Sequence, residues 1–249
     1  MKIHCLGVNS ALEHSSFDTN LLIELDSDIK KDFDKRFIAF DVGRTWPEAM
    51  NNAGFSWMSV TDVFITHLHA DHTGGLEWLA FNNYFKRGFP FGLHRLELYA
   101  DKNVMSELWS NCLRAGLESV QGSVNNIHSY FDVSSIPLNG QFKINNHLFK
   151  IVQTVHVIDN MRIKPSSGLI IETPKGTKIF LTGDTQFCPE QIRTYYEQVD
   201  YIIQDCELAC YPNSVHAQFY QLKTLDENVR KKMYLIHYYG STPPEEEAK

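Results

Sequence analysis

Four side chains that can bind a metal ion lie within six consecutive residues of this chain: His67, His69, Asp71 and His72. They follow the apolar run 63–65 and precede a pair of glycines, so we expect them on a loop between a buried strand and a helix. His67 and His69 are two residues apart, and in an extended segment they point the same way and can bind one metal ion together. Asp71 and His72 come after the chain turns and can reach a second ion close by. Imidazole and carboxylate groups suit zinc, with manganese or iron as alternatives.

The elements that position this loop are expected to be short apolar strands and amphipathic helices. We expect strands at 2–7, 20–25, 37–40, 60–66, 96–100, 127–131, 142–144, 149–156, 168–172, 178–181, 201–206 and 232–237. We expect helices at 46–54, 76–85, 101–117, 188–196 and 215–225. The strands come in two batches, each broken by helices, which favours sheet packed on sheet with helices outside.

Three further metal-binding residue types each end a predicted strand: His156, Asp184 and His237. A single histidine or aspartate at such a place is most often an ordinary residue. Together the three supply the donors that the 67–72 loop lacks for a centre of two metal ions. In layered α/β folds, ligands bind at the carboxyl ends of strands.

The composition of the chain indicates which binding partners and which cellular compartment to expect. The 249 residues carry a formal net charge of -7, which disfavours a long nucleic acid as partner because phosphate backbones are gripped through Lys and Arg. No apolar run approaches the roughly 20 residues that span a bilayer, so we expect no membrane association. The amino-terminal sequence lacks the apolar region of a signal peptide, and the five scattered cysteines indicate reduced, mostly buried thiols. These features predict a cytoplasmic protein.

The His-x-His-x-Asp-His motif, with Gly183-Asp184-Thr185 and Ile236-His237-Tyr238 following in order, resembles the metallo-β-lactamase superfamily in its ribonuclease Z and phosphodiesterase branch. The resemblance covers nearly the whole chain. It implies an α/β protein with an αββα sandwich of two mixed sheets flanked by helices. We expect one such domain over residues 1–249, with 240–249 as a frayed tail.

The resemblance also implies a centre of two zinc ions held by seven side chains. The first ion would be held by His67, His69 and His156. The second ion would be held by Asp71, His72 and His237. Asp184 would bridge both ions, and Asp71 would in addition hold the attacking hydroxide. All seven positions are filled here, which favours an active enzyme.

A leaving-group acid is the other feature that the resemblance implies. In ribonuclease Z-like enzymes a carboxylate on a strand orients a histidine that protonates the leaving oxygen, and His216 fits the place of that histidine. Asp205 is the expected carboxylate, although Glu207 has the same strand parity and could serve instead. A surface histidine that opens a helix is the alternative for His216.

Substrate size is where the chain departs from ribonuclease Z, whose long tRNA-gripping arm lies between the positions that match His156 and Asp184. Here only 27 residues, 157 to 183, separate the two. The chain is most like the phage anti-Pycsar phosphodiesterases, which implies hydrolysis of small cyclic nucleotides such as 3′,5′-cyclic CMP and cyclic UMP, a homodimer, and action in the host cytoplasm.

The same residues are also compatible with other functions: a ribonuclease Z-like tRNA 3′ endonuclease, a cyclic-phosphate hydrolase of phosphonate metabolism, a lactonase or thioesterase, and a non-catalytic nucleotide sponge. The aromatic residues that follow the metal loop could line a base pocket or a dimer interface, and we expect them in the core. These residues are Phe81, Tyr84, Phe85, Phe89 and Phe91.

Overall fold

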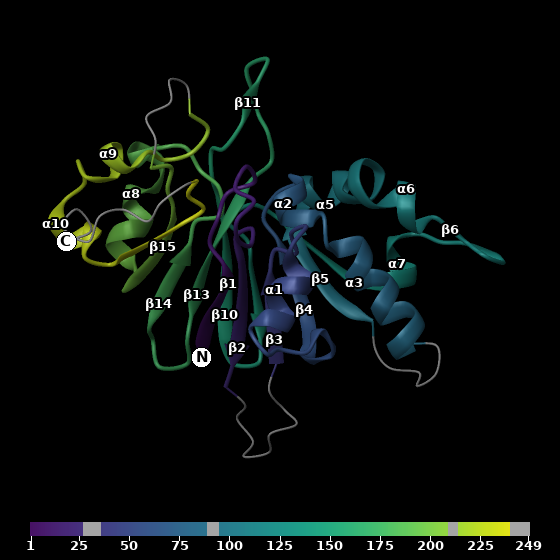
Figure 1. Cartoon of the computed structure of the whole chain (residues 1–249). Helices are drawn as coiled ribbons and strands as arrows, with labels where there is room; N and C mark the ends of the chain where they lie inside the picture. Colours follow the sequence, from purple (N-terminus) through teal and green to yellow (C-terminus); the bar gives the residue numbers. More distant parts are fainter. Residues whose placement is uncertain (27–35, 89–94, 209–213, 240–249) are drawn as a thin grey trace. The chain divides into compact units, whose positions relative to one another are not determined.

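The computed structural model of the chain describes residues 1–26, 36–88, 95–208 and 214–239 (Figure 1). The chain divides into two compact units: the first comprises residues 1–7 and 14–137, and the second comprises residues 8–13 and 138–249. Most of the charge-rich segment 26–36 and the expected frayed tail 240–249 lie outside the described residues. The expectation of one domain over the whole chain stays a prediction.

The first unit is built on a six-stranded mixed sheet. Along the sheet the strands are β1 (Lys2–Gly7), β2 (Asn20–Leu25), β3 (Arg36–Phe40), β4 (Val60–Ile65), β5 (Leu96–Asp101) and β8 (Phe131–Ile136). Strands β3, β4, β5 and β8 run parallel, so their carboxyl ends meet at one edge of the sheet.

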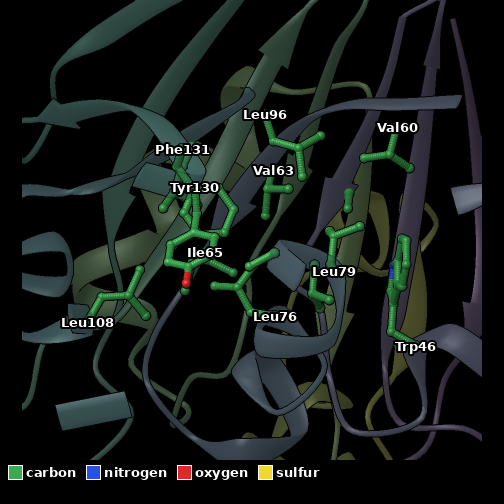
Figure 2. Packing of buried hydrophobic residues seen from close by; sticks show 14 of the residues in the cluster. Trp46, Val60, Val63, Ile65, Leu76, Leu79, Leu96, Leu108, Tyr130 and Phe131 are labelled. Atoms are coloured by element: carbon green, nitrogen blue, oxygen red, sulfur yellow. The ribbon is translucent and has the colours of Figure 1, made fainter. Parts of the chain in front are cut away.

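Helices cover one face of this sheet and bury its apolar residues. They are α1 (Trp46–Asn52), η2 (Trp57–Ser59), α2 (Ala70–Thr73), α3 (Leu76–Asn82), the π-helix η3 (Asn83–Gly88), α5 (Lys102–Leu108), the π-helix η4 (Trp109–Leu113), α6 (Arg114–Leu117) and α7 (Ile127–Tyr130). A hairpin of β6 (Ser119–Val120) and β7 (Ser123–Val124) joins α6 to α7. Figure 2 shows Leu76 and Leu79 of α3 packed with Val63 and Ile65 of β4, the strand that feeds the metal loop.

The second unit has its own six-stranded mixed sheet. Along it the strands are β16 (Met233–Ile236), β15 (Tyr201–Asp205), β14 (Lys178–Leu181), β13 (Ser167–Glu172), β10 (His147–Gln153) and β9 (Gln141–Ile144). The other elements are the hairpin β11 (Ile158–Asp159) and β12 (Arg162–Ile163), and helices α8 (Pro189–Gln198), α9 (Phe219–Leu222) and α10 (Glu227–Arg230). Ile192 and Tyr196 of α8 pack on Phe180 and Ile202 to form the core of this unit.

Two expected elements are wrong. Residues 127–130 form helix α7 instead of a strand, because Asn126 and Ser129 make a capping box at its start. The expected helix 215–225 is reduced to the single turn α9, because the backbone before it bonds elsewhere: the amide of Ala217 donates to the carbonyl of Thr185 at 2.7 Å.

Most of the other side-chain expectations hold. Apolar residues recur at helical spacing along the expected helix 101–117, as is typical of a core-facing helix: Val104, Met105, Leu108 and Leu113 are buried, and Trp109 is partly buried against the same core. Among the aromatics, Phe81 and Tyr84 pack against the core while Phe85 is exposed; residues 89 and 91 lie outside the described ranges.

The four cysteines among the described residues are free thiols. Only Cys206 is fully buried and Cys5 is exposed, so the expectation of mostly buried thiols is wrong. No helix within the described ranges is long and apolar enough to cross a membrane.

Candidate metal centre

The metal-binding loop of the first unit leaves the carboxyl end of β4 and turns into α2. His67 Nε2 lies 3.0 Å from His69 Nδ1, a distance at which one ring donates a hydrogen bond to the other or both rings ligate one cation. Asp71 and His72 follow on helix α2, with His72 Nε2 3.2 Å from Asp71 Oδ2. His67, Asp71 and His72 are buried, and His69 is exposed. The four side chains that the sequence singled out are therefore neighbours within this unit.

Asp41 supports this loop, although the sequence alone does not single it out as a site residue. Its Oδ2 lies 2.7 Å from His72 Nδ1, and its two oxygens accept from the backbone amide and the hydroxyl of Thr66 at 2.8 and 2.9 Å. Thr66 in turn contacts His67 Nδ1 at 3.0 Å. Burial raises the pKa of Asp41, while His72 and Thr66 act to lower it. Asp41 has a φ of 63°, a left-handed conformation that costs a non-glycine residue free energy and is often retained at functional sites.

Residues that follow Asp41 hold the backbone of the loop. The amide of Val42 donates to the carbonyl of His72 at 2.8 Å, and the amide of Gly75 donates to the carbonyl of Val42 at 2.9 Å. A Cβ atom at Gly43 would overlap the carbonyl oxygen of Asp71. Only glycine allows this close approach without moving the loop.

In the second unit, four strands that run in the same direction deliver the remaining candidates to one edge of the sheet. These strands are β10, β14, β15 and β16. His156 follows β10, Asp184 follows β14, Asp205 ends β15 and His237 follows β16. The structure therefore gathers these four at the expected strand ends.

The buried Asp184 carboxylate is the common neighbour of two histidines. Its Oδ2 lies 3.4 Å from His237 Nε2 and 3.7 Å from His156 Nε2. The hydroxyls of Thr154 and Ser166 both donate to its backbone carbonyl, at 3.2 and 3.3 Å, which fixes the turn on which it sits.

The remaining nitrogen of each histidine faces an oxygen. His156 Nδ1 lies 2.9 Å from the carbonyl oxygen of Val215, and His237 Nδ1 lies 3.5 Å from Asp205 Oδ1. Burial lowers the pKa of His156 despite the opposing charge of Asp184, which favours the neutral imidazole that binds metals.

Asp205 is the carboxylate that contacts His216. Asp205 Oδ2 lies 2.9 Å from His216 Nδ1 and also accepts from the amide of Thr185 at 2.8 Å. Burial acts to lower the pKa of His216, but the charge and hydrogen bond of Asp205, with Asp184, outweigh it and raise the pKa above its ordinary value. The backbone of Glu207, the alternative partner, pairs with Ala217 and Phe219.

Both units hold side chains of the kind that bind a divalent metal ion. His72, His156 and His237 each direct Nδ1 toward an oxygen, an arrangement that fixes the ring and leaves Nε2 as the ligand atom. In the second unit, ligand atoms of Asp184, Asp205, His216 and His237 lie within 4.8 Å of one another. Buried imidazole and carboxylate groups at such distances suit zinc, manganese or iron.

The two mixed sheets, their helices and the histidine and aspartate clusters define a protein of the metallo-β-lactamase fold. The metallo-β-lactamase fold protein YhfI from Bacillus subtilis is similar, with a TM-score of 0.71 at 13% identity over 96% of this chain and 87% of that chain. The expected fold class is confirmed. The chain belongs to the family described as Anti-Pycsar protein Apyc1, which matches residues 1–249.

Relatives in this family occur in bacteria and in phages. The chain is 31% identical over 240 residues to an Anti-Pycsar protein Apyc1 from Paenibacillus harenae, covering 96% of this chain and 90% of the relative. It is 26% identical over 246 residues to one from Bacillus phage vB_BveM-Goe7, covering 95% and 88%. The resemblance inferred from the motifs is confirmed at the level of the family.

Proposed function

We propose that this chain is a two-metal phosphodiesterase that hydrolyses small cyclic nucleotides, 3′,5′-cyclic CMP and cyclic UMP among them, to nucleoside monophosphates. The role is counter-defence, by removal of a cyclic-nucleotide immune signal. The name of the family supports this role, since its members are called anti-Pycsar proteins.

The proposed metal ligands are those that the motifs suggested. They are His67, His69 and His156 for one ion, Asp71, His72 and His237 for the other, and Asp184 for both. Two bound divalent ions supply a nucleophile at neutral pH and neutralise charge on the phosphate. Asp71 is proposed to orient the attacking hydroxide. Zinc is the proposed metal, with manganese or iron as alternatives.

The pair of Asp205 and His216 is the observation that carries the proposal. With Nδ1 of His216 held 2.9 Å from Asp205, its Nε2 is the nitrogen that can give up a proton. A phosphodiester that is opened at a ribose oxygen releases an alkoxide, which needs such a proton. A thioesterase has less need of such an acid, because its leaving group is a thiolate. A lactone also releases an alkoxide, so a lactonase is separated from a phosphodiesterase by the substrate panel.

The short interval between His156 and Asp184 supports a small substrate. The 27 residues 157 to 183 are taken up by the hairpin β11–β12 and by strands β13 and β14. The sequence predicts a short loop over 161–167 in this interval, whereas the structure forms the hairpin over 158–163. A long tRNA-gripping arm has no room here, and the net charge of -7 offers little attraction to a long RNA.

The working state of the protein is proposed to be a homodimer in the cytoplasm, which is the host cytoplasm for a phage-encoded copy. The dimer follows from the family resemblance alone. Equilibrium sedimentation of the metal-loaded protein measures it directly, and a monomer at micromolar concentration would remove this part of the proposal.

A substrate panel tests the proposed reaction. Zinc-loaded protein is incubated with 3′,5′- and 2′,3′-cyclic mononucleotides, a bis-phosphodiester, a lactone and a precursor tRNA, each with and without a chelator. We expect chelator-sensitive conversion of 3′,5′-cyclic CMP and cyclic UMP to monophosphates, and intact tRNA. A trimmed tRNA 3′ end beside untouched cyclic nucleotides would replace the proposal with a ribonuclease Z-like function.

A further inference from the structure

Two turns of the second unit expose apolar side chains, and each turn is joined to a segment that carries a proposed metal ligand. We propose that Leu12, on the turn Ser10–Glu13, and Met161, at the tip of hairpin β11–β12, bind the nucleobase of the substrate. This inference rests on the proposed function and names the residues that recognise the base within it. The proposed metal ions would bind the phosphate, and these two side chains would contact the base at the other end of the nucleotide.

The hairpin is fixed to the segment that carries His156. It begins two residues after His156, and the amide of Lys164 closes it by donating to the carbonyl of Val157 at 2.8 Å. Ile158 pairs with Ile163 across the hairpin, and both are about half exposed, at 54% and 48%. Figure 1 shows the hairpin projecting beyond the ends of β10 and β13 in the six-stranded sheet of the second unit. A short ribbon with an exposed apolar pair is poorly stable in water unless something covers it.

The tip of the hairpin exposes an apolar side chain at a turn position where glycine is the favoured residue. Asn160 and Met161 are its two central residues, with φ of 45° and 64°. Two-residue turns with positive φ at both positions favour Asn-Gly, and a side chain at the second position costs roughly 1 kcal/mol. Met161 is nevertheless 98% exposed. Backbone conformations of this cost cluster at active sites and ligand-binding turns, and methionine adapts to flat apolar surfaces.

The second turn is fixed to the segment that carries His237. The amide of His237 donates to the carbonyl of Val8 at 2.6 Å, and the amide of Ser10 donates to the carbonyl of Tyr238 at 3.2 Å. The amide of Glu13 then closes the turn on the carbonyl of Ser10 at 3.1 Å. Leu12, at the centre of this turn, is 81% exposed.

The chemistry of both tips fits the flat faces of a nucleobase. Aliphatic side chains pack on an aromatic ring face and make no hydrogen bonds to its edge, so they do not select a base by its hydrogen-bonding groups. Burial of an exposed Leu or Met side chain against such a face contributes affinity in proportion to the apolar area removed from water. We therefore expect these two residues to bind both purine and pyrimidine cyclic nucleotides.

Steady-state kinetics of the zinc-loaded double variant Leu12→Ser/Met161→Ser test the inference. The substrates are cyclic CMP and methyl p-nitrophenyl phosphate, a small diester without a base. We expect KM for cyclic CMP to rise about tenfold, an order-of-magnitude figure from the apolar area involved, with the base-free diester and the zinc content unchanged. Val124→Ser is the matched control, since Val124 is 83% exposed on the other short hairpin, β6–β7, and should change nothing.

The outcomes separate this inference from the proposed function. An unchanged KM for cyclic CMP in a double variant that still turns it over overturns the inference and leaves the proposed function standing. Equal losses of activity on both substrates would mean that the two turns stabilise the site and do not bind the base, which also overturns the inference. A fall in molecular mass by sedimentation, absent in the control, assigns them to an interface between two copies. A wild-type protein that neither binds nor cleaves cyclic CMP overturns both.

Discussion

His216 is held by Asp205, with Nδ1 and Oδ2 2.9 Å apart, and Asp205 is fully buried between His216 and His237. A carboxylate in this position fixes the tautomer and orientation of the imidazole ring. The pair therefore has the arrangement of a general acid and the residue that orients it.

His216→Ala should lower kcat for a cyclic nucleotide by roughly 10²–10⁴-fold while both metals and the fold are kept, because general-acid catalysis contributes about that much. With a p-nitrophenyl diester the loss should be much smaller, since p-nitrophenolate leaves without a proton. His128→Ala on helix α7 is a control that should leave both rates unchanged. Equal losses on the two substrates would give His216 a structural role.

The pH dependence should reveal the same pair. A raised pKa keeps His216 protonated to higher pH, so the rate with a cyclic nucleotide should fall only as pH rises through that raised value. Asp205→Asn removes the charge that raises the pKa, and burial then lowers it. The alkaline limb of kcat should move to lower pH in this variant. With the p-nitrophenyl diester the limb should not move, and a shift with both substrates would point to another titrating group.

Asp184→Ala should lose most of the bound metal, because this carboxylate is proposed to ligate both ions. Elemental analysis of the wild type should find close to two metal ions per chain, and of the variant far less. Asp226→Ala is the control: Asp226 caps helix α10, so its loss should cost about 1 kcal/mol of stability and no metal. A variant at Asp184 with full metal content and normal turnover would remove it from the ligand set.

Asp41→Asn should weaken metal binding by about 10–100-fold, the usual effect of losing the carboxylate that orients a ligating histidine. Titration with a metal-chelating dye measures this affinity. Asp62→Asn is a matched control, because Asp62 is a buried carboxylate of the same sheet that binds Arg36 at 2.6 and 2.9 Å. It should lower the free energy of unfolding and leave metal affinity unchanged. Equal affinities in the two variants would contradict the role of Asp41.

Most residues of the candidate site could be predicted from the sequence, because the proposed metal ligands directly follow apolar strands. His156, Asp184 and His237 each lie within three residues of a strand end, where a local pattern predicts both the strand and the metal-binding side chain that follows it. Asp41 also follows an apolar run, but its role in the site depends on a hydrogen bond with His72, 31 residues further along the chain. A local pattern holds no information on such a partner.

Errors in the predicted fold have the same origin. Residues 215–218 read as the start of a helix, yet their backbone bonds to Thr185 and Glu207, which are distant in the chain. The hairpin at 158–163 was missed because its tip is Asn160-Met161, without the glycine that marks such turns. For α7 the local signal existed, since Asn126 and Ser129 form a capping box, and it was outweighed by the apolar residues around it.

Turnover of cyclic CMP in water enriched in ¹⁸O tests the central claim most directly. The zinc-loaded protein should convert many equivalents of cyclic CMP per chain to the monophosphate, with one ¹⁸O atom in the phosphate of each product molecule. A chelator should stop the reaction. Stoichiometric binding with release of intact cyclic CMP would contradict the account and make the protein a nucleotide sponge.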